Sequence, residues 1–246
     1  MLMIDIHAHL LPDIDDGPQT LEQSLRMLKM AEDDGITAMA ATPHVFGLLD
    51  EEQNELIQHK FRMLKQSASE SGINIDLHLA SEVFIQPDYK NLLEFSCGTI
   101  NGMGRFTLLE FSMTGLPFGY ESMISRMVEN NLTPIIAHPE RNNMILRDLR
   151  HAQNIVDCGA WLQINSGSLL GDFGRKVRKA AFKLLAMDLV RIVASDAHDN
   201  ESRPPLLSKA RQLVTKYFDE YLANLLFYEH PDYVLTAQPV KTANLK

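Results

Sequence analysis

The chain has 246 residues, of which 45% are hydrophobic and 22% are charged, so it can bury a large core. Its formal charge of −9, from 23 basic and 32 acidic residues, argues against a nucleic-acid surface, which needs a basic footprint. No apolar run approaches the roughly 18–20 residues that span a bilayer, and the start lacks the basic region of a signal peptide. We therefore expect a cytoplasmic protein without direct membrane insertion.

Short apolar runs typical of buried strands alternate with helical patterns along the whole chain. The predicted strands are residues 3–6, 38–41, 75–80, 107–111, 134–137, 161–164 and 190–194. The predicted helices are residues 20–34, 51–71, 120–130, 147–158, 175–187 and 205–218, with a shorter piece near 220–227. This alternation indicates an α/β fold with a mainly parallel sheet, either open and doubly wound or closed into a barrel. No linker divides the chain, so we expect residues 1–246 to form a single domain.

The ends of several predicted helices carry local signals. Thr20 and Gln23 match a capping box, in which a hydroxyl and an amide satisfy free N–H groups at a helix start. Gly35, Gly72 and Gly159 each follow a helical run, where glycine adopts a left-handed conformation without strain. These signals support the predicted boundaries.

Each predicted strand leads into polar side chains at or just beyond its carboxyl end. In chain order these are His7 and His9, His44, Glu82, Glu110, His138 with Arg141, Gln163 with Asn165, and Asp196 with His198. The carboxyl ends of parallel barrel strands converge on one face, where such folds place their active sites. His7 and His9 are two residues apart, so their side chains lie on the same face of a strand and could bind one metal ion together.

Nine of these histidines and carboxylates, counting one acid of the DIDD segment, are candidate metal ligands. They are His7, His9, Asp16, His44, Glu82, Glu110, His138, Asp196 and His198. Since one ion takes roughly three or four protein ligands when a water also binds, nine ligands suit two or three ions. Imidazole and carboxylate donors without a thiolate fit Zn, Mn or Fe. Any one of these residues alone would be an ordinary loop residue, but their repetition at strand ends favours a metal centre.

The segments IDIHAHLLPDIDDGP, ATPH, SE, LLEFS, AHPER and ASDAH followed by RPP resemble the PHP superfamily, named for polymerase and histidinol phosphatase. They are most similar to its bacterial protein-tyrosine phosphatases of capsule and exopolysaccharide synthesis. The similarity runs from Asp5 to about Pro205 and is less clear beyond Leu206. It implies a distorted seven-stranded (β/α)7 barrel of the PHP type that holds three divalent metal ions, often manganese.

The resemblance also implies a role for each candidate residue. The first ion would be held by His7, His9, Glu82 and Asp196. Glu82 would bridge to a second ion that Glu110 and His138 complete, and the third ion would be held by Asp16, His44 and His198. Arg141 and Arg203 match the phosphate-binding arginines of the family.

Together these features predict a metal-dependent protein-tyrosine phosphatase. A metal-activated hydroxide would attack phosphorus in line, while the planar forks of the arginines bind the phosphate oxygens. Asp199 and Glu140 are candidate proton donors. The candidate walls of a pocket for the tyrosyl ring are Phe46, Phe84, Phe118 and Tyr120. The resemblance implies a phosphotyrosine-containing protein partner, the C-terminal tail of a membrane-associated bacterial tyrosine kinase of polysaccharide synthesis.

Three alternative functions are a cysteine-dependent phosphatase, a phosphatase for small molecules and a non-catalytic metal-binding protein. A cysteine phosphatase needs an arginine six residues after its thiolate, but Met103 and Ile164 stand at that distance from Cys97 and Cys158. A phosphatase for histidinol phosphate or another small phosphomonoester stays open, and an enclosed pocket would favour it. A non-catalytic metal-binding regulatory protein also stays open, although the full ligand set with both arginines argues against it.

Overall fold

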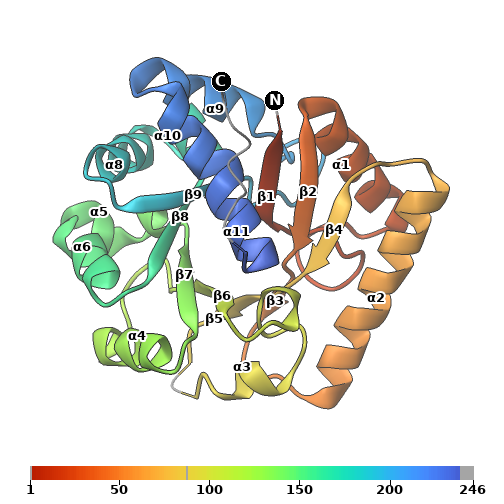
Figure 1. Cartoon of the computed structure of the whole chain (residues 1–246), viewed down its shortest axis with the longest axis horizontal. Helices are drawn as coiled ribbons and strands as arrows, with labels where there is room; N and C mark the ends of the chain where they lie inside the picture. Colours follow the sequence, from red (N-terminus) through yellow and green to blue (C-terminus); the bar gives the residue numbers. More distant parts are fainter. Residues whose placement is uncertain (1, 87, 239–246) are drawn as a thin grey trace.

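The computed structural model of the chain describes residues 2–86 and 88–238. The strands lie in the middle of the molecule and the longer helices surround them (Figure 1). The strands are β1 (Met3–Ala8), β2 (Ile36–Ala41), β3 (His44–Val45), β4 (Asp76–Leu79), β5 (Glu82–Phe84), β6 (Phe106–Glu110), β7 (Thr133–Ala137), β8 (Trp161–Asn165) and β9 (Val190–Ala194). The α-helices are α1 (Leu21–Asp34), α2 (Glu51–Glu70), α3 (Asn91–Glu94), α4 (Tyr120–Glu129), α5 (Asn143–Arg147), α6 (Arg150–Asp157), α7 (Ser166–Leu170), α8 (Arg175–Ala186), α9 (Ser208–Tyr217), α10 (Glu220–Asn224) and α11 (His230–Thr236). Two 3₁₀ helices, η1 (Ile100–Gly102) and η2 (Pro139–Arg141), and a π-helix, η3 (Leu225–Glu229), complete the described part.

The strands form two parallel sheets, which confirms the predicted α/β fold. One sheet has the order β1-β2-β4 and the other the order β3-β5-β6-β7-β8-β9. The sequence predicts seven strands, whereas the described residues contain nine, because β3 and β5 are separate short strands. Thr42 and Pro43 separate β2 from β3, and Ala80 and Ser81 separate β4 from β5. Proline has no N–H to donate, so Pro43 interrupts the ladder at this point.

Backbone hydrogen bonds nevertheless join the two sheets at both sides. The amide of Glu82 donates to the carbonyl of Pro43 at 3.0 Å, next to the two strand breaks. On the other side, the amide of Asp196 donates to the carbonyl of His7 at 2.8 Å, so the end of β9 lies beside the end of β1. The carboxyl ends of strands from both sheets are thereby brought around one site.

The strand residues that face the interior are apolar at one end and polar at the other. Phe106 and Leu108 of β6 belong to an inner apolar cluster with Ile135 of β7, whereas the alternate residue Leu109 packs in the outer core with the helices. Because side chains alternate along a strand, the next inward position on β6 is Glu110. The polar ends of the inward faces therefore form the site, and the apolar ends support it from below.

The helix α11 covers the apolar end of this interior. Its residues Val234 and Leu235 are buried in the inner cluster, and Arg105, directly before β6, donates to the carbonyl of Ala237 at 3.1 Å. Figure 1 shows α11 lying across the strands. The family resemblance assigned no role to residues of this C-terminal segment. In the structure, α11 closes the end of the interior where β6 begins.

The helix boundaries are confirmed in most cases and wrong in one. Thr20 and Gln23 form both bonds of a capping box, and Gly35 after α1 adopts a left-handed conformation with φ 93°. The predicted helix at 147–158 is instead two helices, α5 and α6, because Asp148 is extended and its carboxylate accepts the amide of Arg150, which starts a new helix. Among the described residues, no helix combines the length and apolar character that a membrane crossing requires.

Candidate metal centre

The two histidines at the end of β1 point at one carboxylate. Nε2 of His7 lies 3.2 Å and Nε2 of His9 lies 3.3 Å from Oε2 of Glu82. Asp196 Oδ1 is 3.4 Å from His7 Nε2 and 3.6 Å from His9 Nε2. All four side chains are buried, and one ligand atom of each lies within 4.8 Å of the others. This is the same set of residues that the resemblance implies for the first ion.

The carboxylate of Glu82 also faces a second group. Nε2 of His138 lies 2.9 Å from Glu82 Oε1 and 3.8 Å from Glu110 Oε1. Nδ1 of His44 lies 3.2 Å from Glu82 Oε2 and 3.9 Å from Glu110 Oε2. Oε2 of Glu82 thus faces His7, His9 and His44, while Oε1 faces His138, so this one carboxylate contacts both groups, as a bridging ligand would. The structure places His44 with this group as well as His138, which the resemblance did not imply.

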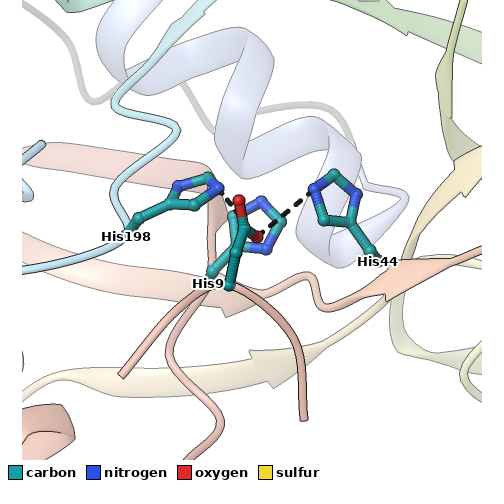
Figure 2. A group of neighbouring side chains, drawn as sticks. His9, His44 and His198 are labelled. Atoms are coloured by element: carbon teal, nitrogen blue, oxygen red, sulfur yellow. Dashed lines mark ion pairs between the residues drawn. The ribbon is translucent and has the colours of Figure 1, made fainter. Parts of the chain in front are cut away.

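A third group lies at the open side of the site. Nε2 of His44 and Nε2 of His198 lie 3.5 Å and 3.3 Å from Oδ1 of Asp16. Figure 2 shows the rings of His9, His44 and His198 gathered from three segments of the chain. His9 therefore belongs to the third group of ligand atoms as well as to the first. The Asp16 side chain is 62% exposed, so solvent reaches the site from this direction.

Two of the candidate ligands have left-handed backbone conformations within two residues of the ends of their strands. His138, after β7, has φ 34° and ψ 49°, and Asp196, after β9, has φ 54°. A left-handed conformation is uncommon for a residue with a side chain and persists where the surroundings enforce it. It turns the chain sharply, so that the side chain points at the site while the following residues lead away.

Asp15 holds the ring of His9 from behind. Its Oδ2 accepts a hydrogen bond from His9 Nδ1 at 2.7 Å and one from the amide of His44 at 2.9 Å. Burial alone would raise the pKa of Asp15, but the bonds and charge of His9 outweigh burial and lower that pKa to about 2. A carboxylate that orients a ligating histidine fixes the tautomer and leaves Nε2 free for the metal. Gly17 is required here, because a Cβ atom would lie 2.9 Å from Cβ of His9.

A chain of buried amides connects two ligands of the first group. Oε1 of Gln163 lies 2.8 Å from Nδ1 of His7, Nε2 of Gln163 donates to Asn165 Oδ1 at 2.9 Å, and Nδ2 of Asn165 donates to Asp196 Oδ2 at 2.6 Å. The sequence placed both amides after the sixth strand but gave them no role. Alternation in β8 was the available signal, since Leu162 packs in the outer core and the buried Gln163 must face inward.

Several buried atoms at the centre have no hydrogen-bond partner among the residues that the structure describes. They are His7 Nε2, His9 Nε2, His44 Nδ1 and Glu82 Oε2. Buried polar atoms are nearly always satisfied, and these four point toward one another. Burial lowers the pKa of His7, but the Glu82 and Asp196 carboxylates outweigh it and raise that pKa to about 9. Burial would raise the pKa of Glu82, but the charge of His7 and the hydrogen bonds from His138, His7 and His9 together outweigh burial and hold that pKa well below its usual value. The donor set and its unsatisfied atoms fit divalent metal ions.

Both predicted arginines point at one oxygen of Asp196. Arg141 Nη1 lies 3.0 Å and Arg203 Nη2 lies 2.5 Å from Asp196 Oδ2. The guanidinium of Arg141 also stacks on the ring of Phe173, 4.3 Å from its centroid. Nε of Arg203 is buried and has no hydrogen-bond partner. Oδ2 of Asp196 is thus occupied by donors, while Oδ1 is left toward His7 and His9.

The two candidate proton donors accept hydrogen bonds that fix nearby segments of the backbone. Asp199 accepts the hydroxyl of Ser202 and the amides of Glu201, Ser202 and Arg203, and these bonds outweigh burial to lower its pKa to about 2. It is therefore a turn-forming carboxylate that carries no proton at neutral pH. Glu140 is fully buried, and its Oε1 accepts Ser168 Oγ at 2.5 Å together with the amide of Asn165. It fixes η2, which carries Arg141, against β8 and α7.

Two of the four candidate aromatic residues lie beside a predicted metal ligand, and the other two lie elsewhere. Phe46 lies beside the predicted ligand His44, with ring centroids 5.0 Å apart, and Phe84 lies 6.2 Å from Phe46. Tyr120 packs against Phe111 at the start of α4, and Phe118 is fully exposed. The pair formed by Phe46 and Phe84 is therefore the one that adjoins the metal centre.

The same chain matches known proteins over nearly its whole length. A family model described as capsular polysaccharide synthesis, CpsB/CapC, matches residues 3–236. The chain belongs to the CpsB/CapC family. CapC of Staphylococcus aureus is 32% identical over 229 residues, which are 90% of this chain and 89% of CapC. The tyrosine-protein phosphatase CpsB of Streptococcus pneumoniae is 30% identical over 242 residues, which are 96% of this chain and 99% of that protein.

Solved structures also resemble this CpsB/CapC chain in fold. It matches a chain from the crystal structures of YwqE from Bacillus subtilis and CpsB from Streptococcus pneumoniae, described as unique metal-dependent tyrosine phosphatases, with a TM-score of 0.90, 29% identity and coverage of 97% and 96% of the two chains. A phosphotriesterase homology protein from Escherichia coli matches with a TM-score of 0.58 at 12% identity, and covers 95% of this chain and 98% of that one. The second likeness shows the fold alone.

Proposed function

We propose that this chain is a metal-dependent protein-tyrosine phosphatase. The observation that carries the proposal is the meeting of four buried, unpartnered ligand atoms, from His7, His9, His44 and Glu82, beneath two arginines. The names of the CpsB and YwqE relatives support the same activity. The fold proposed with it is a distorted seven-stranded barrel of the PHP type, in which β2 with β3 and β4 with β5 each count as one interrupted strand.

The proposed centre holds three divalent ions, with manganese expected and zinc or iron as alternatives. His7, His9, Glu82 and Asp196 would hold the first ion, and Glu82, Glu110 and His138 the second. Asp16, His44 and His198 would hold the third, with His9 and His44 close enough to be shared between groups. Bound divalent ions neutralise phosphate charge and lower the pKa of water, which is the chemistry that ester hydrolysis needs at neutral pH.

The chain's own residues would bind and orient the phosphate. Arg141 and Arg203 already converge at Asp196 Oδ2, at the edge of the first ligand group. Their planar forks suit two phosphate oxygens each, and the unpartnered Nε of Arg203 is a donor that such an oxygen would satisfy. Phe173 under Arg141 and Glu140 behind η2 limit the movement of that arginine. The arginines therefore fix where phosphorus lies relative to the ligands.

The proposed substrate is a phosphotyrosine-containing protein. The family description, capsular polysaccharide synthesis, supports a role in that process. The C-terminal tail of a membrane-associated bacterial tyrosine kinase is the expected partner, and the expected location is the cytoplasm. The open side of the centre, at the exposed Asp16, suits a protein segment better than an enclosed metabolite.

The test is metal add-back with two substrates. The chain is stripped with a chelator and reloaded separately with Mn, Zn, Fe or Mg. Phosphate release is then measured from a phosphotyrosyl peptide and from histidinol phosphate, with His9→Ala as the control. Metal-dependent release that favours the peptide and is lost in His9→Ala supports the proposal. Preference for histidinol phosphate would move the chain to small-molecule chemistry, and no release with metal bound would support a non-catalytic metal-binding regulator.

A further inference from the structure

The pairing of β3 with β5 places two phenylalanines directly beyond two candidate metal ligands. In this parallel pair His44 lies opposite Glu82, and Val45 lies opposite Val83. Side chains alternate along a strand, so Phe84 of β5 lies on the same face as Glu82, and Phe46 follows directly after the end of β3, two residues beyond His44. The rings of Phe46 and Phe84 are 6.2 Å apart, as expected for cross-strand neighbours.

The next strand extends this row of side chains to a third candidate ligand. Phe84 pairs with Glu110 across β5 and β6, while Glu82 pairs with Leu108. The aromatic pair therefore lies one side-chain layer further out than Glu82, level with Glu110. His44 and Glu110 are partly exposed, whereas His7 and His9 are fully buried. The aromatic layer is thus on the side of the metal centre that solvent reaches.

Phe46 is unusually exposed for a phenylalanine in this position. Its side chain is 67% exposed, although its ring contacts His44 at 5.0 Å with an interplanar angle of 32°. The intervening residue Val45 faces the core and is fully buried. An exposed ring next to a polar site leaves apolar surface in water that a bound apolar group would cover.

We infer that Phe46 and Phe84 form an aryl-binding wall that selects phosphate esters of phenols over those of alkyl alcohols. This inference rests on the proposed phosphatase function. With the phosphate at the ligands, the phenyl ring of phosphotyrosine begins at the ester oxygen and extends outward into the layer that these two rings occupy. A phosphoserine side chain has only one methylene between the ester oxygen and its backbone, so it offers no ring to that layer. The wall therefore contributes binding only to aryl esters.

The test compares matched ligands on variants of Phe46 in the metal-loaded protein. The variants are Phe46→Ala, Phe46→Leu and Phe46→Tyr, and the control is Leu48→Ala, which removes an exposed apolar side chain two residues away. The kcat/KM is measured for a phosphotyrosyl peptide and for the same peptide with phosphoserine. Binding of phenylphosphonate and methylphosphonate is measured by calorimetry, and bound metal is quantified for every variant.

Phe46→Ala is expected to lower kcat/KM for the phosphotyrosyl peptide by about tenfold, because the ring stack and the apolar burial are both lost. Phe46→Leu loses the ring stack but keeps much of the apolar surface, so it is expected to lower the same kcat/KM by about threefold. Both variants should leave the phosphoseryl peptide and the metal content little changed, while Phe46→Tyr and Leu48→Ala resemble the wild type. Phenylphosphonate should lose its advantage over methylphosphonate in the same two variants.

An unchanged preference for the phosphotyrosyl peptide in Phe46→Ala, at normal metal content, would overturn the inference. So would equal binding of the two phosphonates to the wild-type chain. Because phosphonate binding needs no turnover, it also separates the two proposals. A metal-loaded chain that binds phenylphosphonate through Phe46 but releases no phosphate would retain the aryl wall and lose the phosphatase.

Discussion

Asp15 accepts a hydrogen bond from Nδ1 of His9 at 2.7 Å, while Nε2 of the same ring faces Glu82 at 3.3 Å. The imidazole is therefore held from behind by one carboxylate and presented to another. The sequence marked the DIDD segment as acidic and assigned Asp16 as a ligand. In the structure Asp15, one residue earlier, is the partner that sets the tautomer of His9, and Asp16 is the exposed acid at the third group.

Replacing Asp15 by Asn should weaken metal binding without removing a ligand. The amide cannot accept from His9 Nδ1 as strongly and presents a donor to the same space, so the ring loses its fixed orientation. Loss of such an orienting carboxylate typically costs 10–100-fold in metal affinity, and we expect about that range. Equilibrium dialysis against manganese measures it, with Asp13→Asn in the same loop as the control. Equal affinity in Asp15→Asn and the wild type would contradict the orienting role.

Replacing Gln163 by Leu should affect both the metal centre and stability. The change removes the hydrogen-bond partner of His7 Nδ1 and of the side-chain oxygen Oδ1 of Asn165, and both residues are fully buried. Each unsatisfied buried group costs about 1–3 kcal/mol, so the free energy of unfolding of the metal-free chain should fall by at least that amount. Urea denaturation measures it. Gln153→Leu on the exposed side of α6, where the side-chain amide donates to Asp157 at 2.8 Å, is the matched control and should change stability little.

Replacing Gly17 by Ala should distort the segment that carries Asp15. The added Cβ would lie 2.9 Å from Cβ of His9, closer than real contacts allow, and 3.0 Å from Oδ1 of Asp15, which is also tight. Overpacking of this kind costs about 1–3 kcal/mol, and here it also displaces a ligand. Gly115→Ala, where nothing lies within 4 Å, is the control. Urea denaturation and manganese dialysis should both change for Gly17→Ala and neither for Gly115→Ala.

Metal affinity should increase as the pH rises. In the metal-free chain the pKa of His7 is raised to about 9, because Glu82 and Asp196 outweigh the effect of burial. His7 is therefore protonated at neutral pH and must lose that proton before Nε2 binds a metal. Affinity should rise between about pH 7 and 9 and level off above the folded pKa. Calorimetry in buffers of different ionisation enthalpy should detect proton release, and a heat that is independent of the buffer would argue against it.

Replacing Arg203 by Lys should impair phosphate ester hydrolysis and leave metal binding largely intact. A lysine retains the charge but lacks the planar fork that can bond Asp196 and a phosphate oxygen together. Removing a donor that stabilises transition-state charge typically lowers kcat by about 10²–10³-fold, and we expect Lys to restore little of that loss. The assay is phosphate release from the phosphotyrosyl peptide, with metal content measured in parallel. Arg147→Lys, at an exposed position on α5, is the control.

The sequence by itself determined the α/β class, most element boundaries and which residues are candidate ligands. These properties are local, since a strand shows its burial in a run of apolar residues and the polar residues of interest come directly after such runs. Thr20 with Gln23 and Gly35 are examples, because a cap involves only residues within one turn of each other. The single domain over residues 1–246 stays a prediction of the same kind.

Only the tertiary structure decided how those residues meet. The link from His7 through Gln163 and Asn165 to Asp196 joins residues that are 189 positions apart in the chain. The convergence of Arg141 and Arg203 on one oxygen of Asp196 depends on η2 after β7 and on the loop after β9. The register of β3 on β5 alone places Phe46 beside Phe84. Strand pairing and register are set by contacts between segments that are distant in the sequence. A candidate ligand can therefore be found from its sequence neighbours, but the residues that it contacts are known only from the fold.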